Sequence, residues 1–474
     1  MTIQSEMTPH ERRAAVALAG VFSTRMLGLF MILPVFALYA EHLSGATPFL
    51  VGLAIGIYGL TQGVFQIPFG LLSDRIGRKP VIYLGLAIFA VGSIVAAMAD
   101  SMMGVVIGRA LQGAGAIAAA VMALAADLTR EEHRLKAMAV IGASIGLSFA
   151  ASMVIGPLIN QWVGLDGLFW LTAVLAVGGM AIVKFVVPQP RQSRFHRDAE
   201  PVPAQFKLVL RDGQLLRLDF GIFVLHMVLT AAFVTVPLVL RDQAGLASAH
   251  HWLVYLGVMV AAIGGMVPFI IIAEKKRLMK QIFVGAISVL TAALLAMAVL
   301  GGSLIGMVVA LVLFFLAFNI LEASLPSLVA KMSPADKKGT AMGVYSSSQF
   351  FGAFVGGAAG GWIHGQVGAT AVFLFCAGLT LLWALWAATM RTPRYLSSYM
   401  VNVGPVNEQK ARELEAEMAA VTGVAEAVVV AEDGVAYLKV DSRTVDEAAL
   451  QVFSVNEDDD EPDNDTTVAG RVVV

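Results

Sequence analysis

The chain has 474 residues, of which 58% are hydrophobic and 14% are charged, and its mean hydropathy is +0.78. A soluble domain contains about 45–50% apolar and about 25% charged residues, so this composition excludes a soluble globular protein and indicates a membrane protein with many spanning segments. The formal net charge of −2 says little about partners, and the single cysteine, Cys376, excludes an internal disulfide and a cysteine-cluster metal site.

Apolar stretches of about 20 residues predict membrane-spanning helices, because that length crosses the hydrocarbon core of a bilayer. Twelve such stretches occur, at 14–40, 49–72, 80–99, 102–126, 136–162, 166–187, 217–240, 250–273, 280–300, 303–330, 339–363 and 369–390. A short polar leader precedes the first stretch, and we expect no cleavable signal peptide.

A dense charged run, GLLSDRIGRKP at 70–80, lies between the second and third stretches. Its spacing, G-x-L-x-D-R-x-G-R-K, resembles the loop 2–3 signature of the major facilitator superfamily of secondary transporters. The alternative is a basic loop that only orients the protein, but orientation requires no glycine or aspartate at fixed offsets.

The resemblance implies a latch that holds two halves of the protein together on the cytoplasmic side while the cavity faces outward. Asp74 would meet the N-terminus of the eleventh helix, near 338–341, where the helix dipole favours an anion. Arg78 would pair with Asp127 at the end of the fourth helix. The predicted gate residues are Gly70, Asp74, Arg75, Gly77, Arg78 and Asp127.

Two arginines lie inside predicted spans, where a charge costs several kcal/mol by most estimates and therefore indicates function. Arg109 lies in RALQG at 109–113, which resembles the helix 4 signature R-x-x-Q-G of the superfamily, whose arginine is linked to proton coupling. A purely structural ion pair is the alternative. Arg25, in the first stretch, could bind an anionic substrate or pair with a carboxylate.

The fifth stretch contains SMVIGPLIN at 152–160. Its Gly156-Pro157 core resembles the antiporter signature G-P-x-x-G-G of the drug/proton exporters, and we expect Pro157 to kink the helix. Asn160 and Gln161 stand where that signature has its final glycines.

The second half of the chain carries three candidate proton sites inside or near its spans. Glu322 is a carboxylate well inside an apolar stretch, where desolvation favours the neutral form that a proton carrier needs. A permanent pair with Arg25 or Arg109 is the alternative. His226 and Asp219 lie seven residues apart, on one face of the seventh helix.

Neutral polar residues recur at helical spacing and are predicted to line the transport cavity. Interhelical hydrogen bonds are the alternative explanation. The residues are Tyr58, Gln62 and Gln66 on the second helix, Asn319 on the tenth, and Tyr345 and Gln349 on the eleventh. Gly352, Gly356 and Gly360, four residues apart, predict a close-packing face on the eleventh helix.

The two halves of the chain repeat, because QIPFGLLSDR at 66–75 aligns with MVPFIIIAEK at 266–275, and AMAV at 137–140 aligns with AMGV at 341–344. Such halves place a substrate cavity near the bilayer midplane, between two bundles that rock against each other. Alternate loops and flanks hold 24 of the 32 Lys and Arg residues, whereas the opposite loops hold only Arg241, so both termini are predicted to be cytoplasmic.

The composition changes after Arg394. The segments 398–403, 425–430 and 435–440 read as strands, and 406–421 and 445–452 as helices, which is the order of a ferredoxin-like module. This region resembles a heavy-metal-associated domain but lacks its Cys-x-x-Cys loop, so we expect no soft-metal site. Regulation, a partner contact or dimerisation are the roles considered for it. An acidic run at 456–465 reads as a disordered tail, unless 468–474 supplies a last strand.

The predicted fold is therefore an all-α membrane protein of twelve helices in two six-helix pseudo-repeats, the fold of the major facilitator superfamily, with a small α+β domain. The parts are an N-terminal bundle (1–187), a linker with an interfacial helix (188–216), a C-terminal bundle (217–391), a ferredoxin-like cytoplasmic domain (392–455) and an acidic tail (456–474).

The predicted function is proton-coupled antiport that exports small amphiphilic compounds across a bacterial inner membrane. No phosphate-binding loop occurs, so a gradient would drive transport. Symport or facilitated uptake is one alternative, and a membrane sensor with a regulatory C-terminal domain is another. The expected partners are lipid, a small-molecule substrate and protons, without nucleic acid, cofactor or metal. We expect no enzyme activity.

Overall fold

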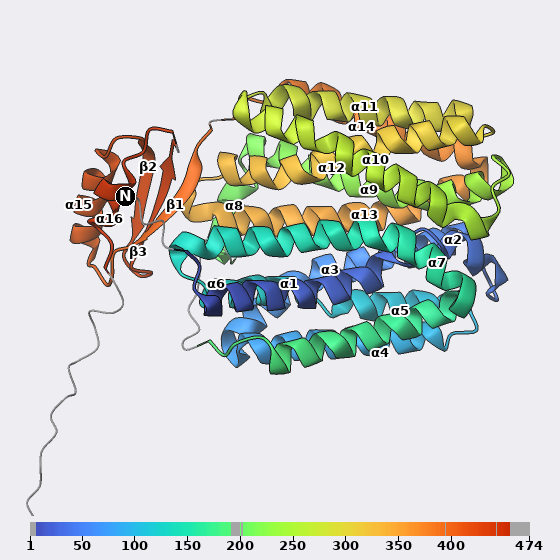
Figure 1. The fold of residues 1–474 in the computed structure, drawn as a ribbon, viewed down its shortest axis with the longest axis horizontal. Coiled ribbons are helices and arrows are strands. Elements are labelled where there is room, and N and C mark those ends of the chain that lie inside the picture. The colour runs from blue at the N-terminus through green and yellow to red at the C-terminus, as the bar shows by residue number, and fades with distance from the viewer. Residues whose placement is uncertain (1–5, 191–199, 201, 394, 442, 456–474) are drawn as a thin grey trace, which may run out of the picture. The chain divides into compact units, whose positions relative to one another are not determined.

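The computed structural model describes residues 6–190, 200, 202–393, 395–441 and 443–455. The chain divides into two compact units between Tyr395 and Leu396, close to the predicted domain boundary at 392. The first unit is a bundle of long helices, and the second is a small sheet with two helices (Figure 1).

The first half of the helical unit runs from α1 to α7. Its elements are α1 (Pro9–Phe30), α2 (Phe36–Tyr39), η1 (Ala40–His42), α3 (Pro48–Ile76), α4 (Arg78–Ala97), α5 (Met102–Ala114), α6 (Ala118–Asp127) and α7 (Glu131–Phe185). The linker that follows contains η2 (Pro203–Gln205) and α8 (Phe206–Val209), so the predicted interfacial helix is a single short turn.

The second half begins at α9 and contains the more apolar helices. Its elements are α9 (Gly213–Asp242), η3 (Ser248–His250), α10 (His251–Lys275), α11 (Met279–Leu300), α12 (Leu304–Met332), η4 (Ala335–Lys337), α13 (Lys338–Val367) and α14 (Ala369–Ala388). Long helices lie side by side along the unit (Figure 1).

Twelve spans fit this arrangement. Within the described ranges, ten helices are long and apolar enough to cross a membrane, and one of these, 136–185, is long enough for two predicted spans. Those two meet at Gly164, whose φ of 68° bends the chain inside α7. The remaining predicted span is α13, which is rich in glycine and serine and falls outside the ten.

Two predicted spans are broken, and both breaks have local causes. The first predicted span ends at Phe30 and continues as a turn at 31–35, because Pro34 lacks an amide hydrogen and its ring collides with the carbonyl four residues earlier. The fourth span is interrupted at 115–117. Gly115 there lies so close to α4 that an added Cβ would be 2.2 Å from the Gly85 carbonyl oxygen.

Helix α13 packs tightly on two neighbours through two glycine edges. Gly352, Gly356 and Gly360 lie against Phe223, Met227 and Ala231 of α9, which confirms the predicted close-packing face. A second edge contacts the other half of the chain, where Gly357 meets Gly52 and Gly361 meets Pro48 of α3. The central position of α13 therefore depends on the absence of side chains at both edges.

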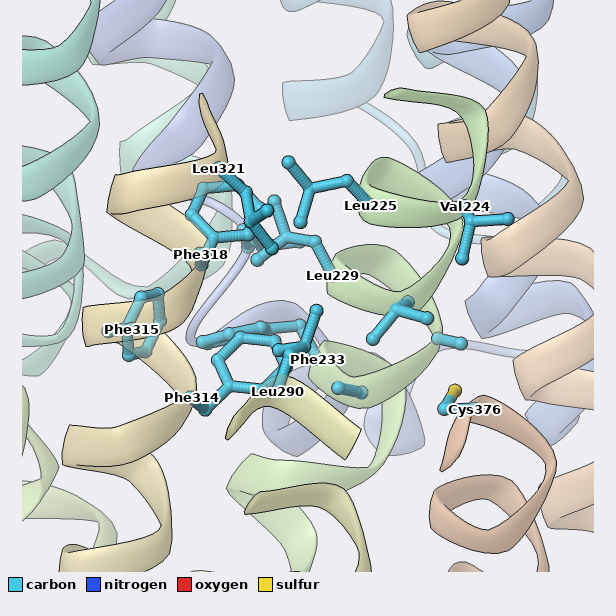
Figure 2. Packing of buried hydrophobic residues seen from close by; sticks show 14 of the residues in the cluster. Val224, Leu225, Leu229, Phe233, Leu290, Phe314, Phe315, Phe318, Leu321 and Cys376 are labelled. Carbon is cyan, nitrogen blue, oxygen red and sulfur yellow. The ribbon is translucent and has the colours of Figure 1, made fainter. Parts of the chain in front are cut away.

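Apolar side chains of α9 and α12 form the core of the second half, with Phe314, Phe315 and Phe318 facing Leu225, Leu229 and Phe233 (Figure 2). Cys376 of α14 is buried at the edge of this cluster, as expected of a packing residue.

An aromatic contact joins the two halves. Phe149 of α7 stacks on Phe318 at a centroid distance of 5.7 Å and meets Phe30 of α1 edge-on at 5.0 Å. The halves are therefore in direct apolar contact inside the unit.

The second unit follows the predicted order of strand, helix, strand, strand and helix. Its elements are β1 (Ser397–Asn402), α15 (Glu408–Ala419), β2 (Val424–Val430), β3 (Val435–Val440) and α16 (Glu447–Gln451). The strand order is β1-β3-β2, and β3 pairs antiparallel with both neighbours. Met418 and Leu450 pack on Leu438 in its core. The predicted acidic run and last strand lie outside the described residues.

We expect Gly356→Ala to lower the thermal stability of the purified protein, because the new Cβ would lie 2.1 Å from the Met227 carbonyl oxygen. Overpacking of this kind costs about 1–3 kcal/mol. Gly378→Ala in α14 is the matched control, since nothing lies within 4 Å of its added Cβ. Melting curves in detergent should separate the two variants, and equal melting temperatures would contradict this account of the α9–α13 contact.

Candidate functional site

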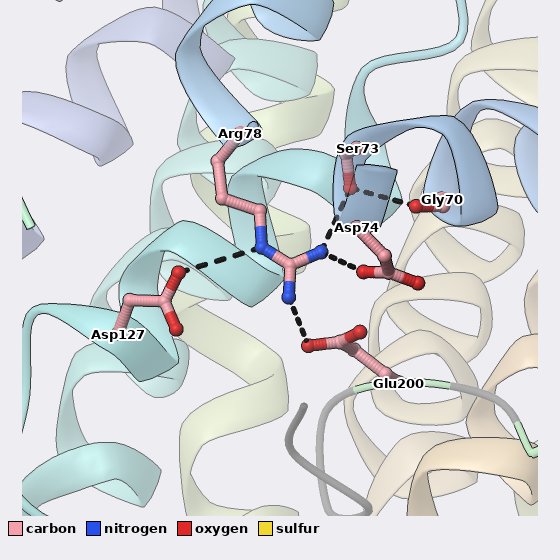
Figure 3. A network of polar contacts seen from close by, with 6 residues as sticks. All are labelled: Gly70, Ser73, Asp74, Arg78, Asp127 and Glu200. Atoms are coloured by element: carbon pink, nitrogen blue, oxygen red, sulfur yellow. Dashed lines mark hydrogen bonds and ion pairs between the residues drawn. The ribbon is translucent and has the colours of Figure 1, made fainter. Parts of the chain in front are cut away.

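The charged run at 70–80 contributes to a compact polar cluster around one guanidinium group (Figure 3). Arg78 Nε donates to Asp127 at 3.4 Å, and its Nη2 donates to Glu200 Oε1 at 2.7 Å. Nη1 pairs with Asp74 and donates to Ser73 Oγ at 2.9 Å. Three carboxylates from α3, α6 and the linker therefore surround a single arginine.

Local backbone geometry places Arg78 in this position. Gly77, with φ of 96°, ends α3 and starts α4, a conformation that a residue with a side chain rarely adopts. Arg78 is consequently the first residue of α4 and points back toward Asp74, four residues earlier. Gly70 allows α6 to approach, because its added Cβ would lie 3.2 Å from the Ala119 methyl group.

The Arg78 cluster is shielded from water to different degrees. The Arg78 side chain is 2% exposed and that of Asp127 is 0% exposed, whereas Asp74 is 31% exposed. Removing one partner of such a buried pair typically costs about 3–5 kcal/mol, because an uncompensated charge is left behind. Arg75, in contrast, is exposed, and its side chain forms no hydrogen bond or ion pair with the described residues.

The sequence predicts that Asp74 contacts the first turn of α13, but in the structure the linker contacts that turn. Among the described residues Asp74 pairs with Arg78 and not with the first turn of α13. That turn meets the linker instead, because Thr340 Oγ1 accepts from the Val202 amide and donates to Gln205, each at 2.9 Å. Sequence reasoning did not find Glu200, which lies 122 residues from Arg78 and belongs to no motif.

The second half carries a counterpart of the Arg78 cluster with the charges exchanged. Glu274, at the end of α10, accepts from Lys331 Nζ, near the end of α12, at 2.6 Å. In the first half the end of α6 supplies the acid, Asp127, and the start of α4 supplies the base, Arg78. In the second half the end of α12 supplies the base, Lys331, and the end of α10 supplies the acid, Glu274. The Arg78–Asp127 pair is more buried than the pair in the repeat, in which Glu274 is 47% exposed.

Arg25 and Arg109 lie inside the first half on either side of one tyrosine. Both guanidinium groups lie over the Tyr58 ring, at 5.8 and 5.2 Å from its centroid. Arg25 donates to Gln62 Oε1 at 2.5 Å, and its Nε and Nη1 have no hydrogen-bond partner among the residues that the structure describes. Arg109 donates to the Ala54 carbonyl at 3.2 Å and to Gln112 at 2.7 Å.

This arrangement decides between two alternatives raised by the sequence. Within the part of the chain that the structure describes, neither Arg25 nor Arg109 has a carboxylate partner, so the pair with Glu322 that was the alternative to a proton site is not formed. Gln62 is fully buried and forms the interhelical hydrogen bond that was the alternative to a cavity-lining role. Gln66 is also buried, at 7% exposure.

Glu322 lies instead beside His226 and Gln349, so that α9, α12 and α13 meet at one polar site. Gln349 Nε2 lies 2.8 Å from His226 Nε2 and donates to Glu322 Oε1 at 3.4 Å. Glu322 Oε2 is 3.9 Å from His226 Nε2 and has no hydrogen-bond partner among the described residues. The amide therefore bridges an imidazole and a carboxylate, and the carboxylate lacks a fixed cation.

Three further predicted residues lie near this site, of which Tyr345 and Asp219 are buried and Asn319 is partly exposed. Tyr345 interacts electrostatically with both Glu322 and Asp219. Its hydroxyl, the Asn319 amide nitrogen and one Asp219 oxygen have no hydrogen-bond partner within the described residues. The second half thus gathers unsatisfied polar atoms from α9, α12 and α13. No three His, Cys, Asp or Glu side chains in the described ranges gather as a metal site would require.

The Gly-Pro element of α7 packs against the first helix. An added Cβ on Gly156 would lie 2.2 Å from the Met31 carbonyl oxygen, so glycine is required for this contact. Pro157 lies inside the continuous α7. Asn160 is buried, and within the described part of the chain neither atom of its side-chain amide has a hydrogen-bond partner. Gln161 donates to the Ala249 carbonyl of the other half at 2.7 Å.

Comparison with known proteins agrees with this architecture. The chain is 50% identical over 446 residues to the inner membrane transport protein YajR of Escherichia coli (strain K12), covering 94% of this chain and 98% of YajR. It is 24% identical over 344 residues to the multidrug resistance protein MdtH of Yersinia enterocolitica, covering 72% and 84% of the two chains.

A solved structure shares the fold at low sequence identity. The human organic anion transporter MFSD10 matches with a TM-score of 0.62 and 20% identity, over 80% of this chain and 100% of that one. The Major Facilitator Superfamily itself matches residues 18–356 and 307–399. Members of this family are transporters rather than enzymes, and this protein, with its helical bundle and its loop signature, belongs to the major facilitator superfamily.

Proposed function

We propose that this transporter is a proton-coupled antiporter that exports small amphiphilic compounds by alternating access across a bacterial inner membrane. Similarity to YajR, named as an inner membrane transport protein, and to MdtH, named as a multidrug resistance protein, supports the location and the export direction. The observation that carries the coupling is the uncompensated Glu322 beside His226 and Gln349.

A carboxylate in this position favours proton uptake for a physical reason. An ionised carboxylate within a membrane-spanning helix is costly unless it is paired, and Glu322, whose side chain is 36% exposed, has no fixed cation among the described residues. Protonation removes the charge, so the halves can then move without carrying an unpaired carboxylate inside the membrane. Contact with Gln349 of α13 links the protonation state to a helix that touches both halves.

The Arg78 cluster supports the gating part of the proposal. It lies at the end of the bundle where the linker joins the two halves, and it has three acidic partners for one base. An outward-facing state would bring Asp74 to the first turn of α13, as the loop signature implies. In the present state the linker residues Glu200, Val202 and Gln205 occupy this region.

We further propose that the Arg78 end is cytoplasmic, together with both chain termini. Of the 32 Lys and Arg residues, 24 flank this end of the spans, which is the pattern of cytoplasmic loops. The ferredoxin-like unit would then also be cytoplasmic, where it could contact a protein partner or a second copy of the chain.

Uptake by symport is a second candidate, favoured by one departure from the exporter pattern. Asn160 and Gln161 replace the two final glycines of the antiporter signature, and Gln161 forms a hydrogen bond to the other half. The same cavity and proton site would serve either direction of coupling. A sensor function is not supported by the transporter relatives.

We expect Glu322→Gln to abolish proton release while the variant still inserts and folds, because glutamine mimics the neutral acid and cannot exchange a proton. Everted vesicles with an acidified lumen and a pH-sensitive dye would report proton efflux after addition of cationic, neutral and anionic amphiphiles. Glu417→Gln, on the exposed surface of α15, is the matched control and should behave like the parent protein.

Three outcomes of this assay have different meanings. Efflux in the parent protein that is lost in Glu322→Gln supports antiport and the proposed carrier. Efflux that survives the substitution rejects Glu322 as the carrier and leaves antiport intact. Dye quenching in the opposite sense, with proton entry coupled to substrate uptake, would favour the symport candidate.

We expect Asp74→Asn to reduce the transport rate by about five- to tenfold without loss of folded protein, because a partly exposed charge-assisted contact with Arg78 is weakened. Asp100→Asn is the control, since that side chain is exposed in a loop at the opposite end. Initial rates in proteoliposomes of matched protein content would measure both. Parent-like turnover by Asp74→Asn would exclude the latch.

A further inference from the structure

A second set of contacts between the halves lies at the end opposite the Arg78 cluster. Arg241, near the end of α9, is the basic residue that the sequence places in the loops of this end. Its Nη1 and Nη2 donate to the two carboxylate oxygens of Glu41, each at 3.2 Å. Glu41 belongs to η1 of the first half, so this bidentate pair joins the halves.

Arg241 is held in position from its own side as well. Its Nε and Nη2 donate to Asp242 at 2.6 and 3.0 Å, so one planar guanidinium serves two carboxylates. Asp242 lies in the same helix as Arg241, and this second pair does not join the halves. Glu41 and Asp242 therefore make similar contacts with Arg241, but only the contact with Glu41 joins the two halves.

Neighbouring contacts close the same end. Gln161 donates to the Ala249 carbonyl across the halves at 2.7 Å. The start of α3 interlocks with the end of α13, where an added Cβ on Gly361 would lie 2.4 Å from the Pro48 carbonyl oxygen. Asn160, next to Gln161, is 3% exposed. Polar and backbone contacts thus join the two halves at this end in the present state.

We propose that the Glu41–Arg241 pair and the Gln161–Ala249 hydrogen bond form an outer gate, which holds the halves together at the Arg241 end while the Arg78 latch is released. This inference rests on the alternating-access part of the proposed function, but not on proton coupling or on the direction of transport. It also assigns a role to Gln161, a position where the antiporter signature has glycine.

The exposure of the pair suits a contact that breaks in each transport cycle. The side chains of Arg241 and Glu41 are 32% and 46% exposed, so water and salt weaken their attraction. Such pairs shift a conformational equilibrium by no more than about fivefold. The Arg78 and Asp127 side chains, at 2% and 0% exposure, are far better shielded.

Cysteine labelling tests the gate without knowledge of the substrate. The chain has one cysteine, Cys376, so a Cys376→Ala background allows Asn160→Cys to report the opening of this end. The full-length protein in lipid nanodiscs would be labelled with a membrane-impermeant maleimide. We expect slow labelling in the background protein and up to about fivefold faster labelling after Glu41→Gln. Asp242→Asn, which breaks the pair within one half, should change the rate much less.

Exchanging the charges of Glu41 and Arg241 tests whether their attraction itself keeps this end closed. Glu41→Arg and Arg241→Glu should each accelerate labelling, and the double variant should return it to the slow rate. Equal labelling of the parent and Glu41→Gln proteins, or failure of the double variant to recover, would overturn the proposal.

Cross-linking provides a second measurement if Asn160→Cys perturbs folding. Glu41→Cys and Arg241→Cys, joined by a short reducible bifunctional reagent in the Cys376→Ala background, should stop transport, and reduction should restore it. Transport that continues after complete cross-linking would refute the gate. Absence of transport in the parent protein would instead reject the proposed function, while the labelling result would still decide on the gate.

Discussion

Close contact along both edges of α13 is the constraint on which the arrangement of the two halves depends. One edge of the helix lies against α9 of its own half, and the other lies against α3 of the first half. Lipid offers no hydrophobic driving force for helix association, so the packing of small residues and interhelical hydrogen bonds must provide it. Gln349 and Tyr345 lie on this same helix, so the polar site and the contact between halves share one structural element.

The charges of the helical unit fall into three environments with different physical consequences. Arg78 is buried among acids, Arg25 and Arg109 are buried against an aromatic ring and amides, and Arg241 is exposed between two carboxylates. Arg78 therefore makes a well-shielded contact, and Arg25 retains hydrogen-bond donors without partners among the described residues. Arg241 makes a contact that can break and form again. Glu322 differs from these arginines because it is an acid, and its described neighbours are the Gln349 amide and the His226 imidazole rather than a lysine or arginine.

The number of spans, the repeat and the small C-terminal unit could be predicted from the sequence, because hydropathy and strand alternation are local signals. The pairing of Arg78 with Asp127 followed from a family signature rather than from spacing. The break at 115–117 could not be predicted, since it depends on how closely α4 and α5 approach. Glu200, Glu41 and Ala249 were also missed. Each meets a partner between 88 and 200 residues away, and no periodicity encodes such a contact.

The different shielding of the two ends makes the resting conformation sensitive to the ionic composition of one compartment. Dissolved ions screen exposed charges over about 8 Å at physiological ionic strength, but they act much less on buried pairs. Salt on the Arg241 side therefore weakens the contact there, whereas the Arg78 cluster is largely unaffected. With the Arg241 end on the outer face of the membrane, as proposed, a medium of low salt would hold more of these molecules closed on that side than a medium of high salt, so the ionic strength outside would set the starting point of the transport cycle.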